Sequence, residues 1–248
     1  MTGTTYDGNL GLEVRGRWWR RTQRPPVSLT VLERADRLLV LPSDQSGGLR
    51  GGDRVTTQVR VLERGWVDWR PPTSNLYFPS ANRRETCTVH THIEVGSEGR
   101  LAWLPPVAIP CTGARIEQEV SIWLTPGVEF LYWDGWIDGR AASGERGGFS
   151  SISNDLEVRW DGRAVFRERW TLRGGVPDGK LDPAGFHGAC QWHLGLAAGP
   201  ESTRQLIDRV RAWQSLGEMA EWGDHGKLTV ARVLGRQARA MPMPDHEN

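Results

Sequence analysis

Apolar and polar residues alternate in several short runs of this chain. In one run, Ile116, Val120, Ile122 and Leu124 fall on one face, and charged or hydroxyl residues fall on the other. Residues 54–61 and 87–95 alternate in the same way. Side chains point to opposite faces at successive positions of a strand, so a period of two residues predicts strands with one buried face. The pattern therefore predicts a mainly β protein.

A hairpin is predicted between residues 156–160 and 163–172. Leu156, Val158 and Trp160 share one face, and Asp161 and Gly162 follow them directly. Asp-Gly between two alternating runs is typical of a two-residue hairpin turn, because both positions of that turn need a positive φ.

The chain also contains a loose internal repeat. Residues 65–72 (Gly-Trp-Val-Asp-Trp-Arg-Pro-Pro) resemble residues 99–106, and Trp69 and Trp103 are 103 − 69 = 34 positions apart. A weaker third copy ends at Trp133, 133 − 103 = 30 positions further on. Similar units at such a period predict strands stacked in coils or layers. Coincidence in a chain rich in Trp and Gly is the alternative.

One helix is predicted near the end of the chain. Pro200 suits a first helical turn, Leu206, Val210 and Trp213 follow a helical spacing together with Ile207, and Gly217 can end the helix. Residues 174–183 are a loop by composition, and residues 241–248 are expected to be a disordered tail. No segment reads as an interdomain linker, so residues 1–240 are expected to form a single β domain.

Composition excludes several classes of protein. The 248 residues carry a formal net charge of +1, so no global attraction to nucleic acid or anionic lipid is expected. No run approaches the ~20 apolar residues of a membrane span, and the first residues do not resemble a signal peptide. Cys87, Cys111 and Cys190 lack paired spacing. Free thiols in a reducing cytoplasm are therefore expected.

Two glycine pairs, Gly47-Gly48 and Gly51-Gly52, close on Asp53. A phosphate-binding loop would need a Lys-Ser/Thr pair and a helix after its last glycine, whereas a strand-like run follows here. A tight turn between strands is the plain interpretation. No serine-hydrolase or zinc-protease motif is present, so an enzyme with its own turnover is not expected.

The segment is more specific than a turn, because Pro42–Arg54 (Pro-x-x-x-x-Gly-Gly-Leu-x-Gly-Gly-Asp-Arg) resembles the N-terminal signature of the urease accessory protein UreD (UreH) family. Three later segments resemble that family in the same order: Leu101–Pro106 with Gly113-Ala114, Gly139–Glu145 including Gly144, and Leu228–Gly235. The resemblance implies stacked, twisted sheets that resemble a β-helix, with one or two short helices.

The resemblance also implies a function. The family acts as a scaffold and nickel metallochaperone that docks on the urease apoprotein, binds UreF and, through UreF, recruits the GTPase UreG. It implies a hetero-oligomeric complex, transient Ni²⁺ and no permanently bound cofactor. Acidic side chains of the family line an internal path for nickel, which matches Asp53, Asp134 and Glu145 here. From the residues alone, these carboxylates and Asp138 sit in glycine-rich turns, where capping backbone N–H groups is the alternative.

A second candidate metal site lies on one face of the predicted strand 87–95. Thr88, His90, His92 and Glu94 share that face, and two imidazoles beside a carboxylate can coordinate Ni, Zn or Cu. A polar outer face without metal is the alternative. His187-x-x-Cys190-x-x-His193 is a weaker ligand set, because a strand would point Cys190 away from both histidines.

Several residues depart from the family pattern. The family's Leu-Pro-Gln-Glu is Leu-Pro-Pro-Val at 104–107, its acid before Gly-Ala is Thr112, and its Thr-Thr-Gln stretch is replaced at 70–73. A paralogue with the same fold and another client protein is therefore an alternative. A carbohydrate-binding module is another, since large aromatics can stack on sugars: Trp18, Trp19, Trp66, Trp69, Trp133 and Trp136.

Overall fold

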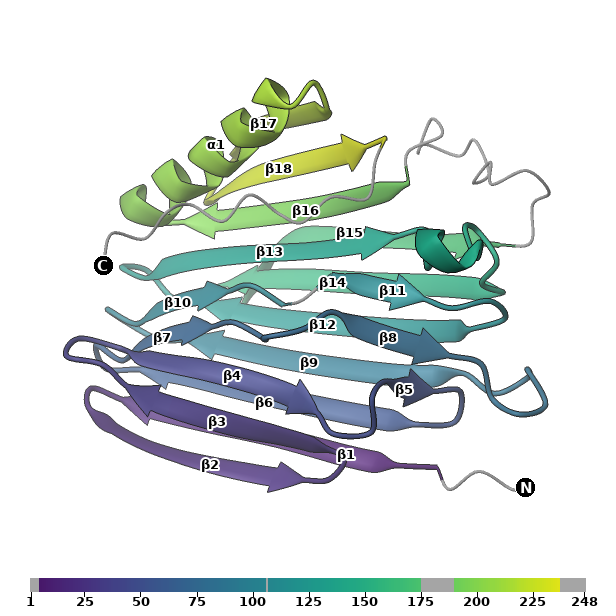
Figure 1. Cartoon of the computed structure of the whole chain (residues 1–248). Helices are drawn as coiled ribbons and strands as arrows, with labels where there is room; N and C mark the ends of the chain where they lie inside the picture. The colour runs from purple at the N-terminus through teal and green to yellow at the C-terminus, as the bar shows by residue number, and fades with distance from the viewer. Residues whose placement is uncertain (1–4, 106, 175–189, 237–248) are drawn as a thin grey trace.

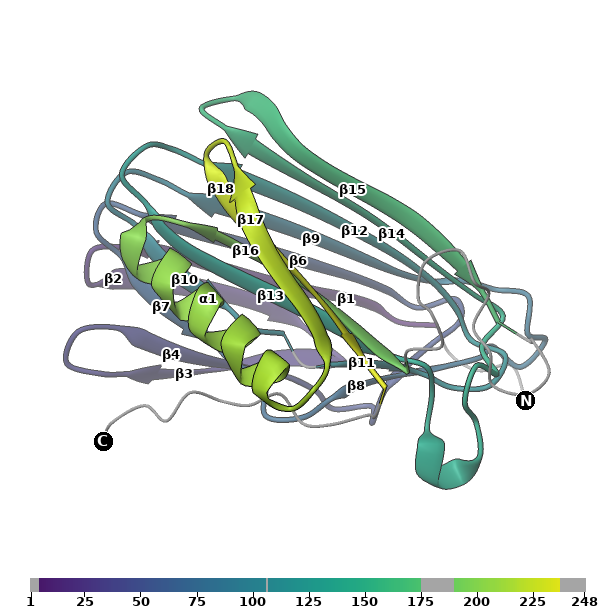
Figure 2. The same ribbon diagram turned by 90° about the horizontal axis from the view of Figure 1, so that it is seen from above.

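Strands form most of the chain, as the alternating pattern predicts. The computed structural model describes residues 5–105, 107–174 and 190–236. Two twisted sheets lie one behind the other in Figure 1 and are seen separating toward one edge in Figure 2. In spatial order, the first sheet contains β15 (Arg163–Arg173), β14 (Ser151–Trp160), β12 (Arg115–Leu124), β9 (Cys87–Val95), β6 (Arg54–Leu62), β1 (Asp7–Arg15) and β2 (Trp18–Arg24).

The second sheet carries the only α-helix of the described residues on its outer face. In order, its main strands are β17 (Met219–His225), β18 (Leu228–Gly235), β16 (Gln191–Ala198), β13 (Glu129–Ile137), β10 (Arg100–Trp103), β7 (Trp66–Trp69), β4 (Leu38–Asp44) and β3 (Val27–Glu33). Three short strands continue it beside β13: β11 (Ala108–Pro110), β8 (Asn75–Phe78) and β5 (Leu49–Arg50).

The central part of the chain winds between the two sheets as a coil. It passes from β6 to β7 and β8, back to β9, on to β10 and β11, and then to β12 and β13, with parallel pairing inside each sheet. Val61 pairs with Val95, and Trp69 pairs with Trp103, whose ring stacks on it at 4.5 Å. One turn of the coil is therefore 34 residues in both sheets (95 − 61 and 103 − 69), which confirms the first two copies of the repeat.

The third copy of the repeat differs from the prediction by one residue. Trp103 pairs with Tyr132, not with Trp133, so the next turn is 132 − 103 = 29 residues long. Trp103 and Tyr132 both line a cavity between the sheets, whereas Trp133 packs on the opposite face of β13 with residues of the helix. Matching one Trp to another ignored the face on which each side chain lies.

The two-residue strand β5, which pairs in parallel with β8, is a short edge of the second sheet. The other four edge strands belong to antiparallel hairpins. They are β2 and β15 in the first sheet and β3 and β17 in the second. The β14–β15 turn is the predicted Asp161-Gly162 pair, with φ values of 51° and 77°. Positive φ at both positions is the geometry of the tight hairpin turn that Asp-Gly favours.

The helix α1 (Pro200–Ser215) begins at the predicted proline and precedes Gly217, whose φ is 77°. Leu206, Val210 and Trp213 are fully buried against Trp133 and other apolar residues of the second sheet. The carboxylate of Glu129 accepts a hydrogen bond from the Ser202 N–H at 2.9 Å, which supplies the cap that Gly199 cannot. A single 3₁₀ turn, η1 (Ala141–Ser143), occurs elsewhere in the described ranges.

The main apolar core lies between the sheets and extends from Leu10 to Val230. Within the described ranges, no helix is long and apolar enough to cross a bilayer. Three predictions lie outside the described residues: most of the loop at 174–183, the tail at 241–248 and the position of His187.

Candidate functional site

A cavity of about 120 Å³ lies between the two sheets. Its walls combine apolar side chains such as Val55 and Trp69 with a group of polar ones. The polar groups lie at inward positions of strands from both sheets: Asp44, Thr57, Asn75, Thr91, Gln118, Tyr132 and Asp134. A cavity of this size has room for ordered water beside these polar side chains, because one water molecule needs only about 10–15 Å³.

Asp134 links the two sheets across this cavity. It is 8% exposed and lies at an inward position of β13. The Gln118 side-chain amide, from β12 of the other sheet, donates to Asp134 Oδ2 at 2.8 Å. The Tyr132 hydroxyl donates to the same oxygen at 3.2 Å, and the Gly135 N–H donates to Oδ1 at 2.8 Å. Both carboxylate oxygens are therefore held in fixed positions.

Burial changes the acidity of Asp134. Desolvation disfavours the carboxylate and raises the pKa of Asp134 to about 6, although hydrogen bonds from Gln118, Gly135 and Tyr132 oppose the shift. A carboxylate with hydroxyl and amide oxygens around it offers hard, exchangeable ligands, which hold a divalent ion less tightly than a His or Cys cage. Across the described residues, no group of three His, Cys, Asp or Glu side chains converges as a closed metal site.

Asp53 is almost completely buried, at 2% exposure, but it caps backbone groups. Its Oδ1 accepts from the Tyr6 N–H at 2.9 Å, and its Oδ2 accepts from the Arg50 N–H at 2.7 Å. It does not line the cavity. The carboxylate thus ties the glycine turn to the chain segment just before β1, which is the turn-capping alternative stated for it above.

The glycine segment itself is required by close packing. A Cβ on Gly48 would lie 2.6 Å from the Phe78 ring, and one on Gly51 would lie 2.4 Å from the Glu85 carbonyl oxygen. Gly48 also has a φ of 137°, and Gly47 and Gly52 have φ values of 77° and 96°. The glycines therefore let this turn pack directly against β8 and the segment after it.

Glu145 forms a two-point ion pair with Arg140. The two pairs of atoms are 2.8 Å and 2.6 Å apart, and the guanidinium lowers the pKa of Glu145. Glu145 does not line the cavity. The Arg140 and Arg50 guanidiniums lie 5.8 Å and 5.7 Å from the Phe78 ring centre. The two loops that contain Asp53 and Glu145 therefore meet at Phe78.

Asp138 is buried in the loop that follows β13. The Arg146 guanidinium donates to Asp138 Oδ2 at 2.9 Å. Burial raises the pKa of Asp138, and Arg146 opposes that shift. Asp138 is 1% exposed and does not line the cavity. Asp138 and Arg146 therefore stabilise the loop between β13 and β14 by pairing within it.

The predicted metal face on β9 lies on the outer surface of the first sheet. His90 Nδ1 is 3.2 Å from Glu119 Oε2, and the His92 ring meets Trp123 edge-on at 5.0 Å. Glu94 pairs with Arg60 at 2.7 Å. The three side chains have separate partners on neighbouring strands. The opposite, inward face of β9 includes Cys87, Ile93 and Val95, which are fully buried as predicted.

The last candidate set leaves one histidine in an apolar setting. His193, on β16, is 3% exposed and packs between Trp133 and Trp213 at 5.6 Å and 5.2 Å. Desolvation lowers the pKa of His193 to about 4. Cys190 is buried just before this strand, and burial raises the pKa of its thiol. A neutral imidazole between two indoles is part of the packing under α1.

Comparison with known proteins now identifies the family. The model of the UreD urease accessory protein family matches residues 9–242. The chain belongs to the UreD family. It is 34% identical over 193 residues to the urease accessory protein UreD of Pseudomonas paraeruginosa (strain DSM 24068 / PA7), covering 77% of this chain and 67% of that protein. It is 33% identical over 196 residues to UreD of Pseudomonas fluorescens (strain Pf0-1), with the same coverage.

The structure adds one residue to the candidate site that the sequence pattern did not predict, Gln118. Gln118 interrupts the apolar face of its strand between Ile116 and Val120, and it is the side chain that reaches Asp134. A polar residue at an inward position of a strand is the signal that could have identified it. The structure also bears on the alternative of a carbohydrate-binding module. Trp69, Trp133 and Trp136 are buried and cannot stack on a sugar.

Proposed function

We propose that this UreD-family protein is a non-enzymatic scaffold that helps insert nickel into urease in the cytoplasm. In this proposal it docks on the urease apoprotein, binds UreF and reaches the GTPase UreG through UreF. Ni²⁺ is the cargo of this assembly and not a resident cofactor. Family membership supports the role in urease maturation, and the named relatives are themselves urease accessory proteins.

The observation that carries the nickel route is the cavity around Asp134, where a group of polar side chains interrupts mainly apolar walls. Oxygen ligands with water can hold Ni²⁺ briefly and release it, whereas a closed His or Cys site would retain the ion. Gln118 and Tyr132 fix the carboxylate so that it lines this space. We therefore assign the ion-facing role to Asp134.

Asp53 and Glu145 take a supporting role in the proposal. Asp53 is held by the N–H groups of Tyr6 and Arg50, Glu145 is held by Arg140, and the two loops meet at Phe78. We propose that they shape the end of the coil near the cavity rather than contact the ion along the whole route. His90, His92 and Glu94 remain a weaker proposal for an external metal contact, because their separate partners must first release them.

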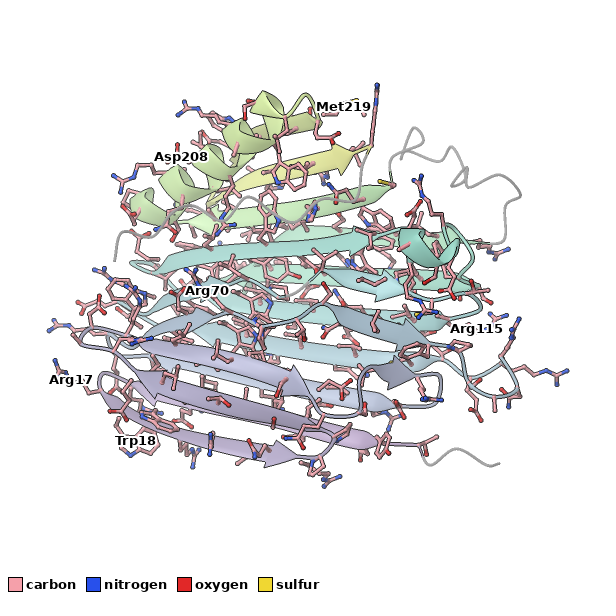
Figure 3. The ribbon with its side chains drawn as sticks, viewed as in Figure 1. Arg17, Trp18, Arg70, Arg115, Asp208 and Met219 are labelled. Carbon is pink, nitrogen blue, oxygen red and sulfur yellow. The ribbon has the colours of Figure 1, made fainter. Side chains whose placement is uncertain are left out.

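Complementation tests the proposal. A host that carries a urease operon without its own UreD gene receives this chain, and urease activity and nickel per urease are measured. The wild-type protein is expected to restore both. Asp134→Asn is expected to lower the nickel content while the variant still co-purifies with urease. The matched control is Asp208→Asn, since Asp208 lies on the solvent side of α1 (Figure 3).

The outcomes separate three ideas. Full rescue by Asp134→Asn would remove the ion-facing role and leave the scaffold. Failure of the folded wild-type protein to co-purify with urease would refute the scaffold and favour a paralogue with another client, as the substitutions at 104–107 allow. Glycan binding is not favoured, because three of the six candidate tryptophans are inside the molecule.

A further inference from the structure

A second hollow, of about 450 Å³, lies on the outer face of the second sheet beside α1. It is separate from the internal cavity because neighbouring residues of β7 face opposite ways: Asp68 lines this outer groove, whereas Trp69 lines the cavity. The groove runs along β7 and β10 and is bordered by α1 from Glu201 to Arg209. Arg70, labelled in Figure 3, lies at this side of the molecule.

Four arginines line the groove, against three carboxylates. The arginines are Arg37, Arg70, Arg100 and Arg209. Two of the carboxylates are directed elsewhere: Glu129 caps the backbone of α1, and Glu201 pairs with Arg204, which is outside the groove. Asp68 is shared between Arg70 and Arg37, at 3.1 Å and 3.6 Å. The surface therefore has more positive than negative charge available to a ligand.

Arg209 is a buried cation at the floor of the groove. It is 4% exposed, and burial together with repulsion from nearby Arg70 lowers the pKa of Arg209 to about 10, with Asp68 opposing the shift. This is a property of the floor of the groove, not of its exposed rim.

The groove also has an aromatic centre and an extension. The Trp66 ring lies 5.3 Å from the Arg37 guanidinium and 5.2 Å from that of Arg100. A neighbouring hollow of about 290 Å³ shares Arg37 and Trp66 and adds three arginines, Arg17, Arg34 and Arg64, against two carboxylates, Glu33 and Asp36. An elongated surface with several guanidiniums and one large aromatic ring suits a length of polypeptide better than a single small anion.

We propose that this surface, the arginine groove, binds an acidic segment of a partner protein. Carboxylates of that segment pair with Arg37 and Arg100, and an apolar side chain rests on Trp66. The inference does not depend on the nickel route, because the internal cavity lies on the other face of the same strands. In this proposal the face beside α1 recognises its partner by the negative charge and extended shape of the bound segment.

The test uses a fluorescein-labelled peptide, Glu-Glu-Leu-Glu-Glu-Leu-Glu-Glu, and the full chain, with binding followed by fluorescence anisotropy at about 50 mM and about 200 mM salt. Arg37→Glu/Arg100→Glu is expected to weaken binding by at least about tenfold. Arg100→Gln, which removes one exposed charge, gives a smaller loss and serves if the double variant does not fold. The control is Arg211→Glu. Arg211 lies on α1 but does not line the groove, so this variant is expected to change the affinity less than about twofold.

The proposal fails if the peptide does not bind, or if Arg211→Glu weakens binding as much as the groove variants do. It also fails if a peptide with Lys in place of Glu binds equally well, since charge would then not select the ligand. Displacement of the acidic peptide by equimolar inorganic phosphate would show a small-anion site and would overturn the assignment to a polypeptide.

Discussion

Asp134→Asn provides a test of the electrostatics inside the sandwich. The substitution removes a buried negative charge and keeps the size of the side chain. The Asn oxygen can accept the Gly135 N–H that now reaches Oδ1 at 2.8 Å. The amide of Gln118, now 2.8 Å from Oδ2, can turn its oxygen toward the new NH₂ group. The Tyr132 hydroxyl, now 3.2 Å from Oδ2, can accept the second hydrogen of the NH₂ group but loses the carboxylate as its own acceptor. That lost bond subtracts part of the gain from removing the buried charge, which is the larger effect.

The magnitude follows from the pKa of Asp134, about 6, against 3.8 for an ordinary Asp. Between these pH values the folded protein keeps a proton that the unfolded chain has released, so the free energy of unfolding falls as the pH rises through this window. A difference of about 2 pKa units corresponds to about 3 kcal/mol. Asp134→Asn is thus expected to be more stable than wild type by up to about 3 kcal/mol at pH 7.5, and the gain disappears near pH 4.

Urea unfolding followed by tryptophan fluorescence, in steps between about pH 4 and pH 7.5, measures this difference. Subtracting wild type from the variant removes groups common to both, such as His193. A difference that does not change with pH, or a variant less stable at pH 7.5, would refute the reasoning. Asp155→Asn is the control with the opposite sign. Arg167 and Arg169 lower the pKa of Asp155 to about 2, so this variant loses stability across the whole range from pH 4 to pH 7.5, and the loss fades only below about pH 4.

Three further changes test the packing. Trp69→Ala removes a ring stacked at 4.5 Å on Trp103 inside the coil and should lower the free energy of unfolding by about 3–5 kcal/mol in urea titrations. Gly51→Ala places a Cβ 2.4 Å from the Glu85 carbonyl oxygen, so thermal melts should show lower stability, and an unchanged melting temperature would contradict the packing assigned to this turn. The folded pKa of His193, about 4, lies below the ordinary 6.5, so its contribution to stability is lost as pH falls between these values; His193→Leu should remove that dependence in denaturant titrations repeated across pH.

Local pattern was enough to predict much of the fold. The strand at 87–95, the Asp-Gly hairpin and the start of α1 at Pro200 follow from alternation and turn chemistry, which act over a few residues. The 34-residue repeat predicted the coil, because residues one turn apart pair directly. Its third copy slipped by one residue because similarity between tryptophans does not reveal whether a ring faces the cavity or α1.

The candidate site depended on contacts that sequence spacing does not reveal. Asp53 caps the N–H of Tyr6, which is 47 residues away, and Gln118 reaches Asp134 from the other sheet. Three acidic positions were predicted from family resemblance as one route, yet Asp134 is the one among them that lines the cavity. A buried carboxylate is predictable from an inward strand position, but its partners depend on how the two sheets face each other.

The antiparallel hairpins at the sheet margins set a limit on self-association. A coil of parallel strands exposes unpaired backbone groups at both ends, and a strand of a second molecule can pair with such an edge. Here the long edge strands β2, β15, β3 and β17 have each turned back on a neighbour, the remaining edge strand β5 is two residues long, and β2 carries Arg20, Arg21 and Arg24 along its length. A strand of a second molecule that continued the parallel pairing would meet β2, which runs in the opposite direction and carries positive charge. The stack therefore ends within one chain, and its broad faces remain available for other proteins.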